Sequence, residues 1–158
     1  MATKPIPEGF HTLTPYLVVR DGAKAIEFYK QAFGAKVRGI HYMPDGKTIL
    51  HADLQFGDSH MMLNDEFPQW GALSPLSNGG ATSVTMHMYV EDVDRVFNQA
   101  VASGATVKMP VMDAFWGDRY GQLVDPFGHQ WSVATHKQDL TEEEMIKASK
   151  AAMSQMGA

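Results

Sequence analysis

The feature that most constrains this sequence is an internal repeat, in which an apolar strand, an amphipathic helix and a Gly-Ala turn occur twice in the same order. The first copy begins at Pro15 and closes at Gly34, and the second begins at Met86 and closes at Gly104. In each predicted helix the apolar residues recur at spacings of three and four, which gives one stripe, and the closing glycine is a typical helix stop. The chain is therefore predicted to contain two similar modules.

Each repeat continues into strand-like segments separated by turn residues. These turns are Pro44–Gly46 and Gly57–Asp58 in the first half and Asp125–Gly128 in the second. Each half thus has the order βαβββ, and because a small open sheet leaves one face uncovered, two such modules are expected to pair and share a core. The predicted fold class is α+β, with two βαβββ modules forming a curled mixed sheet around a cavity, plus a C-terminal helix.

These elements divide the chain into one domain over residues 1–136 and an extension. The predicted regions are, in order, module one at about 12–65, a linker at 66–82, module two at 83–136 and a C-terminal helical extension at 137–158. The linker is rich in Pro, Gly, Ser and Asn, and it is also a candidate cover for the cavity.

The C-terminal helix is predicted between Asp139 and Met156. Thr141 and Glu144 have the spacing of a capping box, which marks a helix start. The apolar stripe of this helix consists of Met145, Ala148, Ala152, Met153 and Met156. Because no other predicted element needs this stripe, the helix is expected to pack either on its own subunit or on a partner subunit.

Composition excludes several classes of partner and chemistry. The formal charge of −5 comes from 18 acidic and 13 basic residues that are scattered, so no basic stripe for nucleic acid is present. No apolar run is long enough for a membrane span or a signal peptide, and a cytoplasmic location is expected. The absence of cysteine excludes thiolate nucleophiles, cysteine-rich zinc sites and iron–sulfur clusters, which leaves His, Asp and Glu as metal ligands.

Strand alternation separates an apolar face from a mixed face in each module, because residues two apart share a face. Met86 and Met88 alternate with His87 and Tyr89, for example, and the mixed face is the one expected to line a pocket. Together with loop residues, the candidates for the ligand-binding pocket are Tyr16, His51, Asp53, His60, Asn64, His87, Tyr89, Trp116 and Arg119.

Five of these candidates leave alternatives open. Arg119 has the chemistry to hold a substrate carboxylate with two hydrogen bonds, or to form a surface ion pair with Asp118 or another neighbour. If His60 and His87 converge with His51 or Asp53, they form a displaced site for a divalent metal such as Zn, Ni, Mn or Fe, and the three histidines are the ligand set expected for it. No nucleophile beside a base, phosphate-binding glycine loop or nucleotide-binding motif is found in the sequence.

Two segments together resemble a known superfamily. Leu17–Gly34, which contains Leu-Val-Val-Arg-Asp and Phe-Tyr-Lys-Gln-Ala-Phe-Gly, is followed much later by Asp125–Trp131, Asp-Pro-Phe-Gly-His-Gln-Trp. In this order they resemble the vicinal oxygen chelate superfamily of glyoxalases, bleomycin-resistance proteins and extradiol dioxygenases. Within it, His51–Ser59 and Phe115–Arg119 look most like the PhnB-like subgroup. The resemblance covers about Leu13 to His136.

This resemblance implies a homodimer of βαβββ modules with a pocket in each curved sheet and, in the enzymes, a divalent metal held by four side chains. The four ligand positions fall at Thr14, Met62, Thr85 and Ser132. None of these residues is a strong ligand for Zn, Ni or Fe, so the sequence predicts no metal cofactor.

Three functions are compatible with these observations. The first is a metal-free binding protein that sequesters or carries a small, partly aromatic ligand. The second is a divalent-metal-dependent lyase, isomerase or dioxygenase with displaced ligands. The third is an oligomeric structural role in which the chain's own side chains fill the cavity. A pocket beside His87 is the observation that separates the first two from the third.

Overall fold

The computed structural model describes residues 2–157, so the outermost residues of the two predicted regions, 1 and 158, lie outside the described residues. The elements of the first half are, in order, β1 (Tyr16–Val19), α1 (Gly22–Phe33), β2 (Lys36–Tyr42), β3 (Ile49–Phe56) and β4 (Ser59–Asp65). Those of the second half are β5 (Thr85–Tyr89), α2 (Val93–Ala102), β6 (Thr106–Asp113), β7 (Asp118–Val124) and β8 (Gln130–His136). A final helix, α3 (Glu142–Met156), follows them.

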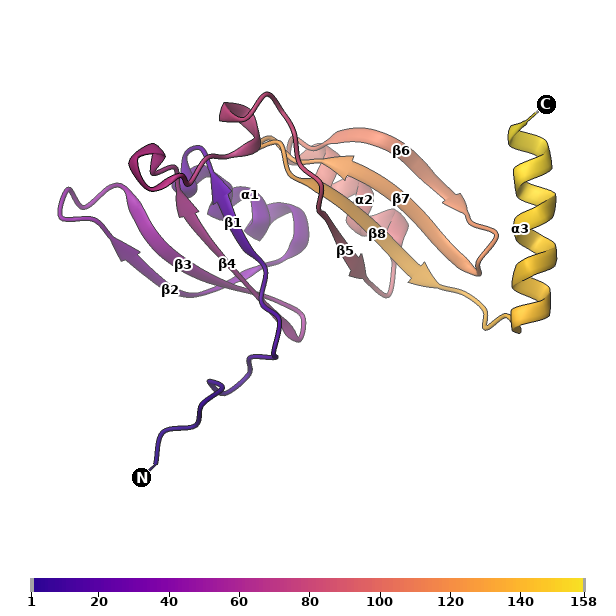
Figure 1. Ribbon diagram of the computed structural model, residues 1–158, viewed down its shortest axis with the longest axis horizontal. Coiled ribbons are helices and arrows are strands. Elements are labelled where there is room, and N and C mark those ends of the chain that lie inside the picture. Colours follow the sequence, from indigo (N-terminus) through magenta and orange to yellow (C-terminus); the bar gives the residue numbers. More distant parts are fainter. Residues whose placement is uncertain (1, 158) are drawn as a thin grey trace.

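The two halves form two four-stranded sheets of identical topology. Their strand orders are β1-β4-β3-β2 and β5-β8-β7-β6, with β1 parallel to β4, β5 parallel to β8 and the other pairs antiparallel. The sheets lie side by side, and α1 packs against α2 (Figure 1). The predicted fold class is confirmed. Within one chain, however, β1 and β5 each remain at the edge of a separate sheet.

Each sheet buries its apolar face under a helix, as the alternation predicts. In β1 and β4, Leu17, Val19, Met61 and Leu63 are all at most 5% exposed. In β8, Trp131 and Val133 are equally buried. These residues belong to one hydrophobic cluster that includes both helices and extends across both modules, so the modules share a core.

The start of each helix is held by a side chain from the last strand of its own module. The carboxylate of Asp65 accepts hydrogen bonds from the backbone N–H groups of Gly22 and Ile49. In the second module the hydroxyl of Thr135 accepts one from the N–H of Val93, 2.9 Å away. Because the N–H groups of Gly22 and Val93 have no partner inside their helices, each strand end fixes the helix that covers its sheet.

A buried carboxylate in the turn between β7 and β8 joins the modules. Asp125 is 4% exposed and accepts hydrogen bonds from the Tyr29 hydroxyl in α1, at 2.6 Å, and from Trp131 Nε1, at 2.9 Å. Its other oxygen accepts the N–H groups of Phe127 and His129. Four donors therefore compensate for the removal of this charge from water, and one of them comes from the first module.

The linker and the C-terminal helix differ in part from the prediction. The linker contains two short 3₁₀ helices, η1 (Pro68–Trp70) and η2 (Pro75–Ser77). Helix α3 begins at Glu142, three residues later than Asp139, and the predicted capping box is present. No helix in the described part of the chain is long and apolar enough to cross a membrane.

Replacing Asp125 with asparagine is expected to destabilise the protein by about 2–4 kcal/mol, because the amide N–H₂ cannot accept hydrogen bonds from Tyr29 or Trp131. Urea unfolding, followed by circular dichroism, measures the change. Asp58→Asn, an exposed position in the β3–β4 turn of the first module, is the control and should shift stability by less than about 0.5 kcal/mol. Equal losses in both variants would contradict the role given to Asp125.

Candidate functional site

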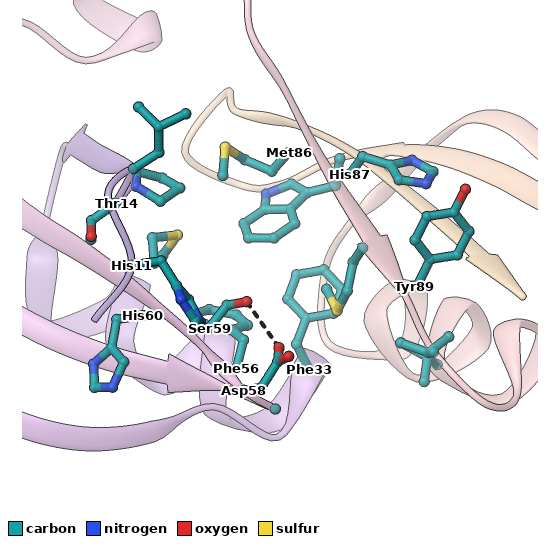
Figure 2. Close-up of a pocket in the computed structure, with 18 of the residues that line it drawn as sticks. His11, Thr14, Phe33, Phe56, Asp58, Ser59, His60, Met86, His87 and Tyr89 are labelled. Carbon is teal, nitrogen blue, oxygen red and sulfur yellow. Dashed lines mark hydrogen bonds between the residues drawn. The ribbon is translucent and has the colours of Figure 1, made fainter. Parts of the chain in front are cut away.

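A cleft of about 740 Å³ lies between the two modules (Figure 2). Its walls are apolar and come from both halves of the chain, with Phe33, Phe56 and Met61 from the first module and Met86, Met88 and Trp131 from the second. These residues belong to the apolar faces of the strands and to the end of α1. The cavity of a single chain therefore lies between the sheets, and it is not enclosed by the mixed face of either one.

Three aromatic rings bring the two modules together at this cleft. The ring centroid of Trp131, in β8, lies 4.7 Å from that of Phe33 and 5.8 Å from that of Phe56, with which it is stacked. Trp131 is held in place by its hydrogen bond to Asp125. The buried turn thus orients the ring on which the walls of both modules meet.

Polar groups surround the apolar walls. Three of the predicted pocket residues, His60, His87 and Tyr89, line the cleft, and Figure 2 shows His60 on the opposite side from His87 and Tyr89. Asp58 and Ser59 also line it and are joined by a hydrogen bond of 3.0 Å. A pocket beside His87 is therefore present.

One cation at this cleft lacks a partner. The guanidinium groups of Arg20, Arg38 and Arg119 each bond a Glu, Gln or Asp side chain. Arg95, which lines the cleft from α2, has no such partner for its guanidinium among residues 2–157. This group is free to bind a polar substituent of a ligand.

The open face of the first sheet brings four predicted residues into two hydrogen-bonded pairs. The Tyr16 hydroxyl lies 2.9 Å from His51 Nδ1, and His60 Nδ1 lies 2.9 Å from the Asp53 carboxylate. Phe10 stacks on the His60 ring with centroids 4.2 Å apart, so the N-terminal segment covers this pair. Burial raises the pKa of the Tyr16 hydroxyl above its ordinary value.

The predicted residue Asn64 has a structural partner. It is 7% exposed and donates its side-chain N–H to the backbone carbonyl of Asp65. That bond supports the strand end that holds α1.

The open face of the second sheet is organised around Asp118. Its carboxylate, 4% exposed, accepts hydrogen bonds from Tyr89, from Trp116 Nε1 and from His136 Nδ1, at 3.1, 3.0 and 2.7 Å. Burial alone would raise the pKa of this carboxyl, but the three bonds outweigh it and the pKa is lowered from its ordinary value. Nearby, His87 Nδ1 lies 2.6 Å from the Ser132 hydroxyl.

Arg119 is not brought to the other predicted pocket residues. It pairs with Asp94 at 2.7 Å and with Asp113 at 3.2 Å, and these carboxylates raise its pKa. Its neighbour Tyr120 faces the open side of β7, so Arg119 points to the other side. Of its two predicted roles, the structure shows the ion pair, although the partners are Asp94 and Asp113 and not Asp118.

The residues at the four family positions do not fit a metal ion. Thr14 and Met62 lie together in the first module, and Ser132, in the second, is engaged by His87. No group of three or more His, Asp or Glu side chains with the spacing to hold a metal is found within residues 2–157. His51, His60 and His87 therefore do not converge into the displaced metal site that the sequence left open.

The predicted pocket residues did not include the apolar cleft walls Met61, Met86 and Met88, because the mixed face of each sheet was the one expected to line the pocket. A signal was present, since methionine on successive inward positions of a strand indicates an adaptable surface more than a rigid core. The linker was a candidate cover for the cavity, but none of the described residues 66–82 lines this cleft. Instead, Pro75 packs close to Gly128, in the turn that contains Asp125.

The sequence and the fold match known proteins. Residues 9–133 match the family model described as the Glyoxalase/Bleomycin resistance protein/Dioxygenase superfamily. An uncharacterized protein of Mycobacterium bovis, Mb0911c, is 45% identical over 148 residues, 92% of this chain and 93% of that protein.

Among solved structures, TioX from Micromonospora sp. ML1 is 28% identical and covers 80% of this chain and 98% of its own, with a TM-score of 0.62. The At5g48480 gene product of Arabidopsis thaliana is 27% identical, covering 79% and 98%, also with a TM-score of 0.62.

The stabilising contribution of the His136–Asp118 pair is expected to depend on pH. Hydrogen bonds to Asp118 and Asp139 raise the pKa of His136, so its stabilising charge is present at low pH and is lost as pH rises through the raised pKa. The lowered pKa of Asp118 has the opposite sign, and its contribution is lost as pH falls through that pKa. The pair is therefore expected to stabilise the fold between about pH 4 and 6.5, the two ordinary pKa values.

An imidazole NMR titration checks this. The midpoint of His136 should lie above about 6.5 in the wild type and move down in Asp118→Asn. Asp113, at the end of β6, pairs with Arg119 and not with His136. Asp113→Asn therefore removes one negative charge but should leave the His136 midpoint in place. A midpoint unaffected by Asp118→Asn would refute the assigned interaction.

Proposed function

The chain belongs to the Glyoxalase/Bleomycin resistance protein/Dioxygenase superfamily, and on that basis we propose that it is a cytoplasmic protein that sequesters or carries a small, apolar, partly aromatic molecule in the cleft between its modules. We propose that the protein binds no metal ion and that, within the superfamily, it belongs to the PhnB-like subgroup.

The observation that carries the proposal is the chemistry of the cleft walls. A volume of about 740 Å³ lies within the range of about 300–1,000 Å³ that is usual for small-molecule sites. Methionine side chains adapt to ligands of irregular shape, and the rings of Phe33, Phe56 and Trp131 offer apolar surface to a flat one. A ligand with an apolar body therefore gains most from this site.

The polar rim supports a ligand with a few polar substituents. His87 has its Nδ1 fixed by Ser132, which leaves Nε2 to bond a ligand atom. The free guanidinium of Arg95 offers donors to an oxygen substituent. Such groups orient a ligand, whereas the apolar walls provide most of the affinity.

The proposal that no metal is bound is based on the side chains at the four family ligand positions. Threonine, serine and methionine at the four family positions are poor ligands for Zn, Ni, Mn or Fe. Metal analysis of protein purified without an affinity tag should find far less than one ion per chain. About one ion per chain, lost on His87→Ala, would instead favour the metal-dependent lyase, isomerase or dioxygenase.

The neutral, flat dye N-phenyl-1-naphthylamine is expected to bind with a rise in fluorescence. Met86→Lys places a charge in the apolar wall and should weaken binding at least about tenfold, or ~1.4 kcal/mol. Met112→Lys makes the same change on β6, outside the cleft and at a side chain that is 49% exposed, and should bind as the wild type does.

A second variant separates binding from folding. Ser59→Trp adds bulk at an exposed position on the rim of the cleft and should also block the dye while the circular dichroism spectrum stays unchanged. Undiminished binding in both Met86→Lys and Ser59→Trp would rule out the cleft as the binding site.

A further inference from the structure

The N-terminal segment, residues 2–15, forms part of the wall of the cleft. Four of its residues line the cleft, and these are His11, Leu13, Thr14 and Pro15. Figure 2 shows His11 and Thr14 on the same side of the cleft as His60, with His87 on the opposite side. A ligand in the cleft therefore lies beside this segment, and movement of the segment changes access to the cleft.

Two attachment points hold the segment on the first module. At its end, the carbonyl of Pro15 accepts a hydrogen bond of 2.9 Å from the N–H of Met62 in β4. Further upstream, the ring of Phe10 stacks on that of His60, with centroids 4.2 Å apart and 28° between the planes. Gly9 has a φ of 84°, and a Cβ added there would lie 3.3 Å from His60 Nε2. Gly9 and Phe10 are thus both fitted to the same imidazole ring.

Apart from these two points, the segment is held weakly. Among the described residues 2–157, no hydrogen bond or ion pair joins residues 2–14 to either module. The bonds that are present stay inside the segment, from the N–H of Phe10 to the carbonyl of Pro7 and between Lys4 and Glu8. Figure 1 shows the chain before β1 extending away from the sheets. Because segments with so few bonds open locally at small free-energy cost, breaking the Phe10 stack frees the segment to move about Pro15.

The His60 ring is a fixed platform for this stack. Its Nδ1 lies 2.9 and 3.1 Å from the two carboxylate oxygens of Asp53, on the neighbouring strand β3. The side chains of His60 and Asp53 are only 11% and 16% exposed. Phe10 itself is not among the residues that line the cleft. It therefore holds the segment in place without touching a ligand.

We propose that the N-terminal segment is a gate for the cleft, hinged at Pro15 and latched by the stacking of Phe10 on His60. The proposal rests on the proposed function, since it concerns the exchange of a ligand at the same cleft. Leu13, which lines the cleft and is 89% exposed, lies at its mouth and moves away when the latch opens. One aromatic pair is enough to change the open fraction about two- to tenfold, so the latch sets the rate at which a ligand enters and leaves.

Stopped-flow fluorescence with N-phenyl-1-naphthylamine tests the gate. Phe10→Ala should raise the association and dissociation rate constants together, by about threefold or more, because opening precedes both steps. The dissociation constant should stay within about twofold of the wild type, since Phe10 does not line the cleft. Unchanged rates in Phe10→Ala, or faster dissociation alone, would overturn the gate.

Two variants serve as controls for this measurement. Phe10→Tyr keeps an aromatic ring on His60 and should keep the wild-type rates. Ile6→Ala removes a 51% exposed apolar side chain from the same segment, upstream of the latch, and should also keep them. A rise in Ile6→Ala equal to that in Phe10→Ala would contradict the role given to the stack.

A measurement without ligand separates the latch from the proposed function. Because the chain has no cysteine, Glu8→Cys can carry a single nitroxide label, at a side chain that is 91% exposed. The electron paramagnetic resonance spectrum should be dominated by a slow component, and Phe10→Ala should convert it to a fast one. A fast component alone in both chains would overturn the latch even if the dye binds. A slow component without any dye binding would instead overturn the proposed function, and the gate with it, but not the latch.

Discussion

The carboxylate of Asp125 is the contact on which the arrangement of the two modules depends. It receives the hydroxyl of Tyr29 from the first module and the indole N–H of Trp131 from the second, in a site almost closed to water. Burial and the neighbouring carboxylate raise the pKa of Tyr29 well above its ordinary value, so its hydroxyl stays a donor. The hydrogen bond from the indole N–H of Trp131 to Asp125 also orients the Trp131 ring, which lines the cleft. The turn that joins the modules therefore also shapes the cleft between them.

The two modules share a fold but differ in the polar chemistry of their open faces. Their helices are held at equivalent strand ends, by Asp65 in one and by Thr135 in the other. On the open faces, the first module has the pair of Asp53 and His60, whereas the second gathers aromatic donors around Asp118. Both networks are satisfied internally. The apolar cleft, in contrast, has surface left for a ligand, which is why the proposed function is placed there.

Much of the fold could be predicted from the sequence, because periodicity and capping are local signals. The alternation of Met86 and Met88 with His87 gives the two faces of β5, and the capping box of Thr141 and Glu144 marks the first turn of α3. The position of the cleft could not be predicted, since it depends on long-range contacts such as that between Tyr29 and Asp125, 96 residues apart. Alternation therefore assigns each strand residue to a face of its own sheet, but it does not give how the two sheets lie relative to each other.

The measurement that tests the account most directly is a spectrum of the protein with labelled methionine methyl groups during titration with N-phenyl-1-naphthylamine. Apart from Met1, the methionines are spread over the cleft, the sheet surfaces and α3. The account predicts that the methyl signals of Met61, Met86 and Met88 shift together and saturate, while that of Met112 stays in place. A shift of Met112 with unchanged signals from the three cleft methionines would contradict it and move the site to the open face of the second sheet.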